Sequence, residues 1–526
     1  MAPRLSLLLS LVAASTLVSS PPAVAAPLPG CRVPSKLAGG QPTDTAFSIS
    51  EDTPDSLPFV TRNGTTLLVD GSPFHFAGFN NYYMPTYAAD ENLNERTQDV
   101  DVVFAESEQL GLTVLRTWAF ADGPQWNSIQ PNLGQLDERV LSQGLDYVLA
   151  QSCQHGLRVV LTLTNYLTAY GGMQTWVQWF GGTSVLEFYT NPTIVSAFKT
   201  YVKTIVNRRN SLTGVLYRDD PTIMAWDLAN EPYVLGDASG EILRNWVKDM
   251  SAYVKSIDPA HLVMVSSWGY FGKSTPELQP QNPYDLTWRG IGNNAGLYSA
   301  DPLCKGEDWV AINELDDIDI ASVHIYAEFW PVCTADCQFN LNQSAPQMLE
   351  VQLGMQGYWA MCSQECKQQF LKNWLRLHFE VAAQRFEKPV VVGEFGAQLP
   401  MADRIGIYQA VYDEVLDAAT DGLPAAGSMF WILQPATHND YDGYSIYTDP
   451  ARYPHDPKPI QPIPSPTVCS GGNATDDFWG AGLYLTCSAG LIETPFNASV
   501  DVNTDGWQNV IEMIMEQAAA MTAMSQ

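Results

Sequence analysis

Short apolar runs alternate along the chain with longer segments in which apolar residues recur at helical spacing. Such runs predict buried parallel strands, and the longer periodic segments predict the helices that connect them. Strands are predicted at residues 76–82, 114–120, 158–165, 222–230, 262–267, 318–326, 389–395 and 427–433. Helices are predicted at 97–110, 136–155, 193–207, 241–257, 365–385, 404–419 and 507–524. The pattern is typical of an α/β protein with a parallel sheet.

Eight strand–helix repeats favour a (β/α)8 TIM barrel. An open, doubly wound sheet is the alternative, but no glycine fingerprint follows the first strand. A hairpin at 59–76, with turns at Asn63-Gly64 and Asp70-Gly71, could close the floor of the barrel. Insertions at about 271–317, 331–364 and 444–504 follow strand C-termini, so extended loops are expected on the C-terminal face.

The first 57 residues precede this pattern. Residues 1–26 combine Arg4, an apolar core and small residues before Ala26, as secretory signal peptides do. Residues 27–57 are rich in Pro, Ser, Thr and Asp and predict a leader or linker. The domain that follows is predicted at 58–526. A secreted, extracellular protein is therefore expected.

Composition narrows the choice of partner. The chain has 526 residues, and its hydrophobic fraction of 46% is ample for a large core. The formal net charge of −30 argues against nucleic acid, anionic membranes and acidic polysaccharides as partners. A neutral substrate is compatible with it, and the 15 Trp residues suit stacking against sugar rings.

Nine cysteines fit an oxidising compartment, and the odd number leaves at least one unpaired. The spacing predicts two bridges between the pairs Cys333/Cys337 and Cys362/Cys366, and a third between Cys469 and Cys487. A zinc site from the four central cysteines is an alternative without a CxxC spacing to support it. Cys153 is predicted to be a buried free thiol. Four Asn-x-Ser/Thr sequences, at residues 63, 342, 473 and 497, are possible glycosylation sites on surface loops.

Two glutamates stand at the ends of apolar strands. Glu231 follows the run 222–230 and precedes Pro232, which is expected to hold Glu231 in extended geometry. Glu394 ends the run 389–395 between Gly393 and Gly396. A buried Glu needs either a structural ion pair or a catalytic role. Two glutamates on one face of a barrel meet the requirement for cleaving a glycosidic bond, with one as acid and the other as nucleophile.

Other polar and aromatic residues occupy strand ends where Val, Ile or Leu would be usual. They are Asn80, Tyr82, Arg116, Trp118, Asn165, Asn230, Trp268, His324, Tyr326 and Trp431. Each alone has a structural explanation, but together they predict a ring of binding residues around one face. His324 lacks a ligand partner at regular spacing, so no metal or other cofactor is expected. Phosphate loops and Gly-x-Ser-x-Gly elbows are absent from the sequence.

In this order, the motifs resemble glycoside hydrolase family 5, and most of all its eukaryotic endo-β-1,4-mannanases. The resemblance runs from about residue 59 to 442. The motifs are Arg116-Thr-Trp-Ala-Phe-Ala-Asp-Gly123, Asp220-Pro-Thr-Ile-Met-Ala-Trp226, Asn230-Glu-Pro232, His324-Ile-Tyr326, Gly393-Glu-Phe-Gly396 and Phe430-Trp431.

The resemblance implies a retaining double displacement, with Glu231 as acid/base and Glu394 as nucleophile. Asn230 would bond the sugar 2-hydroxyl, and Arg116 would orient Glu394 and lower its pKa. His324 and Tyr326 would line the site, and Trp431 would lie under the sugar. Trp118, Asn165 and Trp268 are expected to bind substrate as well.

The resemblance implies a hydrolase of neutral β-1,4-linked polysaccharides of the mannan type, and we expect it to be a monomer. Three positions depart from the family pattern: Asp227 stands where Glu is usual, Tyr233 where Arg is usual, and Trp268 where Glu is usual. An endo-β-1,4-glucanase or a mannan transglycosylase with the same two glutamates therefore remains an alternative. A non-catalytic carbohydrate-binding protein is the alternative from another class.

Overall fold

The structure is a computed structural model. It describes residues 58–90, 97–283, 305–327, 364–397, 401–438, 440, 442–448 and 507–525. The predicted signal peptide and leader, and most of the insertions at 331–364 and 444–504, lie outside these residues. The predicted domain boundaries therefore stay a prediction.

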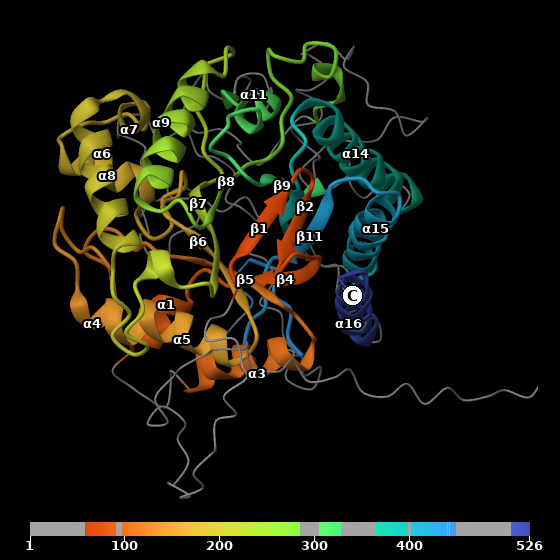
Figure 1. The fold of residues 1–526 in the computed structure, drawn as a ribbon, viewed down its shortest axis with the longest axis horizontal. Coiled ribbons are helices and arrows are strands. Elements are labelled where there is room, and N and C mark those ends of the chain that lie inside the picture. Colours follow the sequence, from red (N-terminus) through yellow and green to blue (C-terminus); the bar gives the residue numbers. More distant parts are fainter. Residues whose placement is uncertain are drawn as a thin grey trace, which may run out of the picture.

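Eight parallel strands form the barrel, in the order β8-β7-β6-β5-β4-β11-β10-β9 (Figure 1). A parallel bridge between Met264 of β8 and Ile320, just before β9, joins the two ends of this order. The strands are β4 (Phe76–Asn80), β5 (Val114–Trp118), β6 (Arg158–Thr162), β7 (Ile223–Asn230), β8 (Leu262–Ser266), β9 (Ala321–Ile325), β10 (Val390–Phe395) and β11 (Ala425–Phe430). The predicted TIM barrel is confirmed, and the alternative of an open sheet is excluded.

Helices surround the strands, with α14, α15 and α16 on one flank and α6 to α9 on the other (Figure 1). Their bounds are α1 (Met84–Ala88), η1 (Thr97–Asp101), α3 (Val102–Gln109), α4 (Glu138–Val140), η2 (Leu141–Leu145), α5 (Asp146–Gln154), α6 (Gly172–Trp179), α7 (Leu186–Thr190), α8 (Pro192–Val206), η3 (Tyr217–Asp219), α9 (Glu241–Ile257), η4 (Gln279–Gln281), α11 (Trp309–Asn313), α14 (Gln364–Arg385), α15 (Met401–Thr420) and α16 (Trp507–Met524). The longer helices match the predicted ones. Helices α1, α6, α7 and α11 were not predicted, because their five to eight residues are too few to show a period.

The floor of the barrel is closed by the predicted N-terminal hairpin, which continues into a third strand. It consists of β1 (Val60–Asn63), β2 (Thr66–Val69) and β3 (Ser72–Pro73). Val60 and Leu67 are buried in one apolar cluster with Met224, Met264 and Val391 from the barrel interior. Burial of such side chains contributes about 1.5–3 kcal/mol each, so the hairpin seals the N-terminal end against water.

One cysteine prediction is wrong. Cys153, at the end of α5, forms a disulfide bond and is not a free thiol. Its burial before a strand does not distinguish the two states, because disulfide cysteines are also among the most buried residues. The other eight cysteines have no described side chains, so their predicted pairing stays a prediction. Within the described part of the chain, no helix is long and apolar enough to cross a membrane.

Candidate active site

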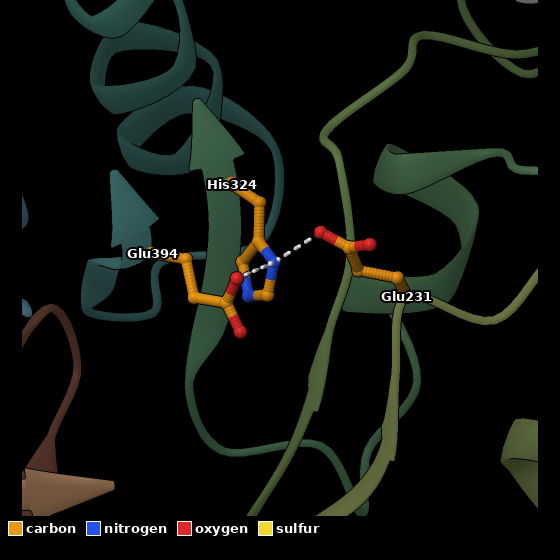
Figure 2. A group of neighbouring side chains, drawn as sticks. All are labelled: Glu231, His324 and Glu394. Atoms are coloured by element: carbon orange, nitrogen blue, oxygen red, sulfur yellow. Dashed lines mark hydrogen bonds and ion pairs between the residues drawn. The ribbon is translucent and has the colours of Figure 1, made fainter. Parts of the chain in front are cut away.

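The C-terminal ends of β7, β9 and β10 bring Glu231, His324 and Glu394 together (Figure 2). Nδ1 of His324 lies 2.9 Å from Oε1 of Glu231 and 3.5 Å from Oε2 of Glu394. One ligand atom from each of the three side chains lies within 4.8 Å of the other two. All three residues are buried. Two carboxyl groups that are 163 residues apart in the sequence therefore lie on either side of one imidazole.

The backbone of Glu231 differs from the extended geometry expected before proline. Its φ is +44°, in the left-handed region. The pairing of β7 with β8 shifts register between Asp227 and Asn230, and the Glu231 N–H then donates to the carbonyl of Ser266 at 2.8 Å. Left-handed backbone costs a non-glycine residue about 1–2 kcal/mol, so surrounding contacts hold it in place. The turn directs the carboxylate toward His324 (Figure 2).

Arg116 of β5 binds side chains from three other strands, β4, β7 and β10. Its Nη1 donates to Oε1 of Glu394 at 2.5 Å and to Oδ1 of Asn80 at 3.0 Å. Its Nη2 donates to Oδ1 of Asn230 at 2.7 Å and to Oδ2 of Asp227 at 2.9 Å. Burial alone would lower the pKa of Arg116, but Asp227 and Glu394 raise it above its usual value. The guanidinium is therefore a permanent buried cation beside Glu394.

Asp227 is the main residue of the site that the sequence analysis did not assign. Besides Arg116, it accepts hydrogen bonds from the hydroxyls of Thr162 at 2.8 Å and Ser266 at 2.7 Å. The backbone N–H of Ser266 is a further donor, at 2.9 Å. A carboxylate inside the wholly buried strand β7 requires a buried cation, and that requirement could have identified it from the sequence.

His324 is a neutral imidazole between the two glutamates. Burial lowers its pKa to about 4, with Glu394 opposing the shift only in part. Its Nε2 is buried and has no hydrogen-bond partner among the described residues. The single proton therefore belongs on Nδ1, where it is shared toward Glu231 and Glu394. The sequence predicted that His324 lines the site, and the structure puts it between both glutamates.

Burial raises the pKa of Glu394, and Arg116 is one of the groups that oppose the shift. The hydroxyl of Tyr326 also opposes it by donating to Oε2 of Glu394 at 2.8 Å. Arg116 lowers this pKa as expected, but desolvation outweighs His324, Arg116 and Tyr326 together, so the net shift is upward and the lowered pKa expected for Glu394 is wrong. Both oxygens of Glu394 are nevertheless held by named donors, which fixes the orientation of the carboxylate.

The aromatic residues of the predicted ring have different positions. Trp431, after β11, is partly exposed and stacks on Tyr82 with ring centres 5.3 Å apart and an interplanar angle of 5°. Its indole N–H donates to Asp442 at 3.0 Å, a partner that the sequence analysis did not assign. Trp118 is buried and packs 4.7 Å from Tyr82, so it supports that ring and does not face solvent.

Trp268 and Asn165 are both buried. Asn165 accepts from Nδ2 of Asn230 at 3.1 Å and thereby orients it. Trp268 lies in a separate aromatic group and contacts Tyr326 at 5.9 Å. Its ring stacks on Tyr233 with centres 6.5 Å apart, and Lys305 Nζ lies 4.6 Å from the centre of the Tyr233 ring. Two of the residues that depart from the family pattern, Tyr233 and Trp268, therefore pack against each other next to the site.

Glu231, His324 and Glu394 also have the ligand types and spacing of a possible cation site. The guanidinium of Arg116 already contacts Glu394, and its charge would repel a second cation there. Acid–base chemistry by the two carboxyl groups fits this arrangement better than metal binding. Arg116 and Tyr326 donate to Glu394 and hold its carboxylate in place. Glu231 contacts the neutral imidazole of His324.

A closed (β/α)8 barrel with two facing carboxyl groups at its C-terminal end defines a glycoside hydrolase. Comparison with known proteins identifies the family. Residues 57–280 match the family model "GH family 5 beta-mannosidase-like". The chain belongs to glycoside hydrolase family 5.

Similar sequences and structures agree with this assignment. Mannan endo-1,4-beta-mannosidase 2 of Oryza sativa is 38% identical over 403 residues, which cover 74% of this chain and 80% of the relative. Mannan endo-1,4-beta-mannosidase 5 of Arabidopsis thaliana is 33% identical, over 82% of this chain and 90% of the relative. The endo-1,4-beta-D-mannanase of Thermotoga petrophila superposes with a TM-score of 0.55 at 30% identity, covering 72% of this chain and 96% of that chain.

Proposed function

We propose that this protein is an endo-β-1,4-mannanase that cleaves internal bonds of mannan, galactomannan or glucomannan with retention of configuration. Sequence relatives at 33–38% identity carry the name mannan endo-1,4-beta-mannosidase. The observation that carries the mechanism is the short distance between the carboxyl groups, with an oxygen of Glu231 within 4.8 Å of one of Glu394. Retaining glycosidases hold the two groups about 5–5.5 Å apart, whereas inverting enzymes leave about 6.5–9.5 Å for a water.

The contacts favour Glu394 as nucleophile and Glu231 as acid/base. In the first step an oxygen of Glu394 bonds to the anomeric carbon while Glu231 gives its proton to the departing glycosidic oxygen. In the second step Glu231 takes a proton from water, the water oxygen bonds to the same carbon, and Glu394 leaves as a carboxylate. Arg116 stabilises the carboxylate before and after these steps, because its charge lies 2.5 Å away.

Asn230 is suited to hold the sugar during both steps. Its Oδ1 accepts from Arg116, and one hydrogen of Nδ2 goes to Asn165. The second amide hydrogen is available for the sugar 2-hydroxyl, whose hydrogen bonds strengthen as charge develops. Trp431, stacked flat on Tyr82, offers the aromatic face beneath the sugar.

Export from the cell follows from the predicted signal peptide and belongs to the same proposal, as does action as a monomer. A neutral polysaccharide outside the cell fits a chain of net charge −30. Endo-β-1,4-glucanase and mannan transglycosylase activities use the same two glutamates, and the aromatic pair Tyr233–Trp268 next to the site is the feature that favours testing them.

The test measures reducing-sugar release from galactomannan, glucomannan and carboxymethylcellulose. Release from the first two is expected, and activity on carboxymethylcellulose alone would overturn the mannanase assignment. Glu394→Ala should abolish release from all substrates. Glu231→Ala should lose most activity but recover part of it on aryl glycosides, whose leaving groups need no proton. Activity that survives Glu394→Ala would contradict the mechanism.

A further inference from the structure

Aromatic rings form a continuous row from the catalytic centre to the protein surface. The row begins at Trp431, which stacks on Tyr82. Tyr82 contacts Tyr83 at 5.4 Å between ring centres, and Tyr83 contacts Tyr87 at 4.7 Å. Tyr87 contacts Trp126 at 5.1 Å, edge to face. The row is therefore a single chain of contacts that ends at Trp126.

Trp126 is 53% exposed, more than any other large hydrophobic side chain that the structure describes. Trp431, Tyr82 and Tyr87 are partly exposed, and only Tyr83 is fully covered. An indole in water contributes little to folding, and exposed aromatic surface often marks a binding site. A single exposed hydrophobic side chain needs no ligand, but the contact of Trp126 with the rings of the site favours a role in binding.

The loop that carries Trp126 is held rigidly. The next residue, Asn127, has a φ of +47°, an unusual conformation for a residue other than glycine. Its Nδ2 donates to the carbonyl of Thr86 in α1 at 2.9 Å, and its Oδ1 accepts from Nη2 of Arg139 at 2.7 Å. At the base of the loop, the N–H of Gly123 donates to the carbonyl of Gln130 at 3.0 Å. These bonds fix the indole before a ligand arrives, which lowers the entropy cost of binding.

The row crosses three neighbouring strands of the barrel. Trp431 follows β11, Tyr82 follows β4 and Trp126 follows β5. Glu231 follows β7, which is two strands beyond β5. The row therefore extends from the ring beside the catalytic centre over the C-terminal ends of adjacent strands.

We propose that Trp126 is a distal binding platform for a pyranose ring of a neutral β-1,4-linked polysaccharide. The apolar C–H face of such a ring packs on an aromatic face, while its hydroxyls remain in water. Four ring-to-ring steps, each of 4.7 to 5.4 Å, separate the platform from Trp431. The proposal rests on the proposed function, because it takes the substrate to be a polysaccharide bound at the two glutamates.

The experiment compares long and short substrates of one chemistry. The ratio of kcat/KM for mannohexaose to kcat/KM for mannotriose is measured in the wild type and in Trp126→Ala. The variant is expected to lower this ratio about two- to tenfold, the range that one aromatic contact represents. Trp126→Phe should keep most of the ratio, because it keeps a ring.

Two further variants separate the platform from general damage. Asn127→Gly tolerates the positive φ but removes both side-chain bonds, so the ratio should fall part of the way. Leu186→Ala removes a side chain of similar exposure on α7, which is outside the row, and should leave the ratio unchanged. Thermal unfolding of each variant confirms that the fold is intact. An unchanged ratio in Trp126→Ala would overturn the proposal.

Binding to the inactive Glu394→Gln variant separates this proposal from the proposed function. Calorimetry with mannan-type and cellulose-type hexasaccharides and trisaccharides, with and without Trp126→Ala, needs no cleavage. If the wild type does not cleave mannan but Trp126→Ala weakens binding of a long cellulose-type chain, the function proposal fails and the platform stands. If no hexasaccharide loses affinity in Trp126→Ala, the platform is wrong whatever the enzyme cleaves.

Discussion

Two buried arginines on neighbouring strands show how the two ends of the barrel differ. Arg116 lies near the C-terminal end of β5 and Arg158 at the N-terminal start of β6. Asp227 and Glu394 raise the pKa of Arg116 despite its burial. Burial lowers the pKa of Arg158 to about 10, and Asp220 opposes this only in part, while the side chain donates to the carbonyl of Pro221.

The two arginines have different partners because the two ends of the barrel have different roles. At the C-terminal end, one guanidinium is surrounded by two carboxylates and two amides that the substrate site uses. At the N-terminal end, the guanidinium of Arg158 donates to the carbonyl of Pro221, and an apolar cluster that includes Val60 and Leu67 fills the barrel interior. A charge cluster at one end and a plug at the other let the same strands carry chemistry and stability separately.

The largest expected effect comes from replacing each arginine by methionine. Arg116→Met should lower kcat/KM about 10²–10³-fold and the free energy of unfolding by about 3–5 kcal/mol, because two buried carboxylates lose their cation. Arg158→Met should leave kcat/KM unchanged. It should lower the free energy of unfolding by about 1–3 kcal/mol, because the carbonyl of Pro221 loses its donor. Kinetics and urea unfolding measure both quantities. Equal losses of activity in the two variants would contradict the separation of roles.

A smaller effect on kcat/KM is expected from removing the hydroxyl of Tyr326. Tyr217 also donates to a buried carboxylate and allows a matched comparison. Tyr326→Phe removes the 2.8 Å bond to Glu394 and should lower kcat/KM about ten- to a hundredfold. Because this bond lowers the pKa of Glu394, its loss should also move the acidic limb of the pH–rate profile to higher pH. Tyr217→Phe removes the matching 2.5 Å bond to Asp146, outside the site, and serves as control. A change in its pH–rate profile would count against the comparison.

The smallest effect on catalysis is expected from two buried aspartates that each accept from a tryptophan indole. Burial raises the pKa of Asp122, bonded to Trp176 at 3.0 Å, to about 8. Asp258, bonded to Trp226 at 2.7 Å, is also desolvated, but His261 reverses the shift and lowers its pKa. The two groups should therefore make stability depend on pH in opposite directions.

The pKa of Asp122 in the folded protein lies above its value of 3.8 in the unfolded chain. The contribution of Asp122 to stability is therefore complete below pH 3.8. It is lost as the pH rises toward 8, by up to about 1.4 kcal/mol per pH unit. Asp122→Asn mimics the protonated form and should flatten this slope. Asp258, with a lowered folded pKa, stabilises the fold above pH 3.8, and Asp258→Asn should lower stability at neutral pH. Urea unfolding between pH 4 and 8 measures both, and a steeper slope in Asp122→Asn would refute the assignment.

Much of the barrel could be predicted, because buried strands and amphipathic helices leave periodic patterns. The helix at 241–257 matches α9 at both ends. Predicted strands extended past the observed ones, as with 76–82 against Phe76–Asn80, because their last residues leave the ladder to face the site. The short helices α6 and α7 were missed, since eight and five residues show too little of a period.

The candidate site could be predicted in part. The sequence placed Glu231, Glu394 and Arg116 at strand ends, and the structure brings all three together. It did not reveal Asp227 as the second partner of Arg116, nor the bond of Trp431 to Asp442. Arg116 and Asp227 are 111 residues apart, and no local sequence pattern shows which strands bring their side chains together. Trp431 and Asp442 are only 11 residues apart, but they lie in a connection without a periodic pattern that would place them.

The sequence by itself determined the alternation of strands and helices, the polar strand ends and the family, because these depend on residue types and local spacing. Only the tertiary structure decided that His324 lies between both glutamates, that Glu231 adopts left-handed backbone and that Cys153 is bonded. It also decided that burial outweighs Arg116 in setting the pKa of Glu394. Desolvation and Coulomb interactions depend on distances through space, and closure of the barrel sets those distances.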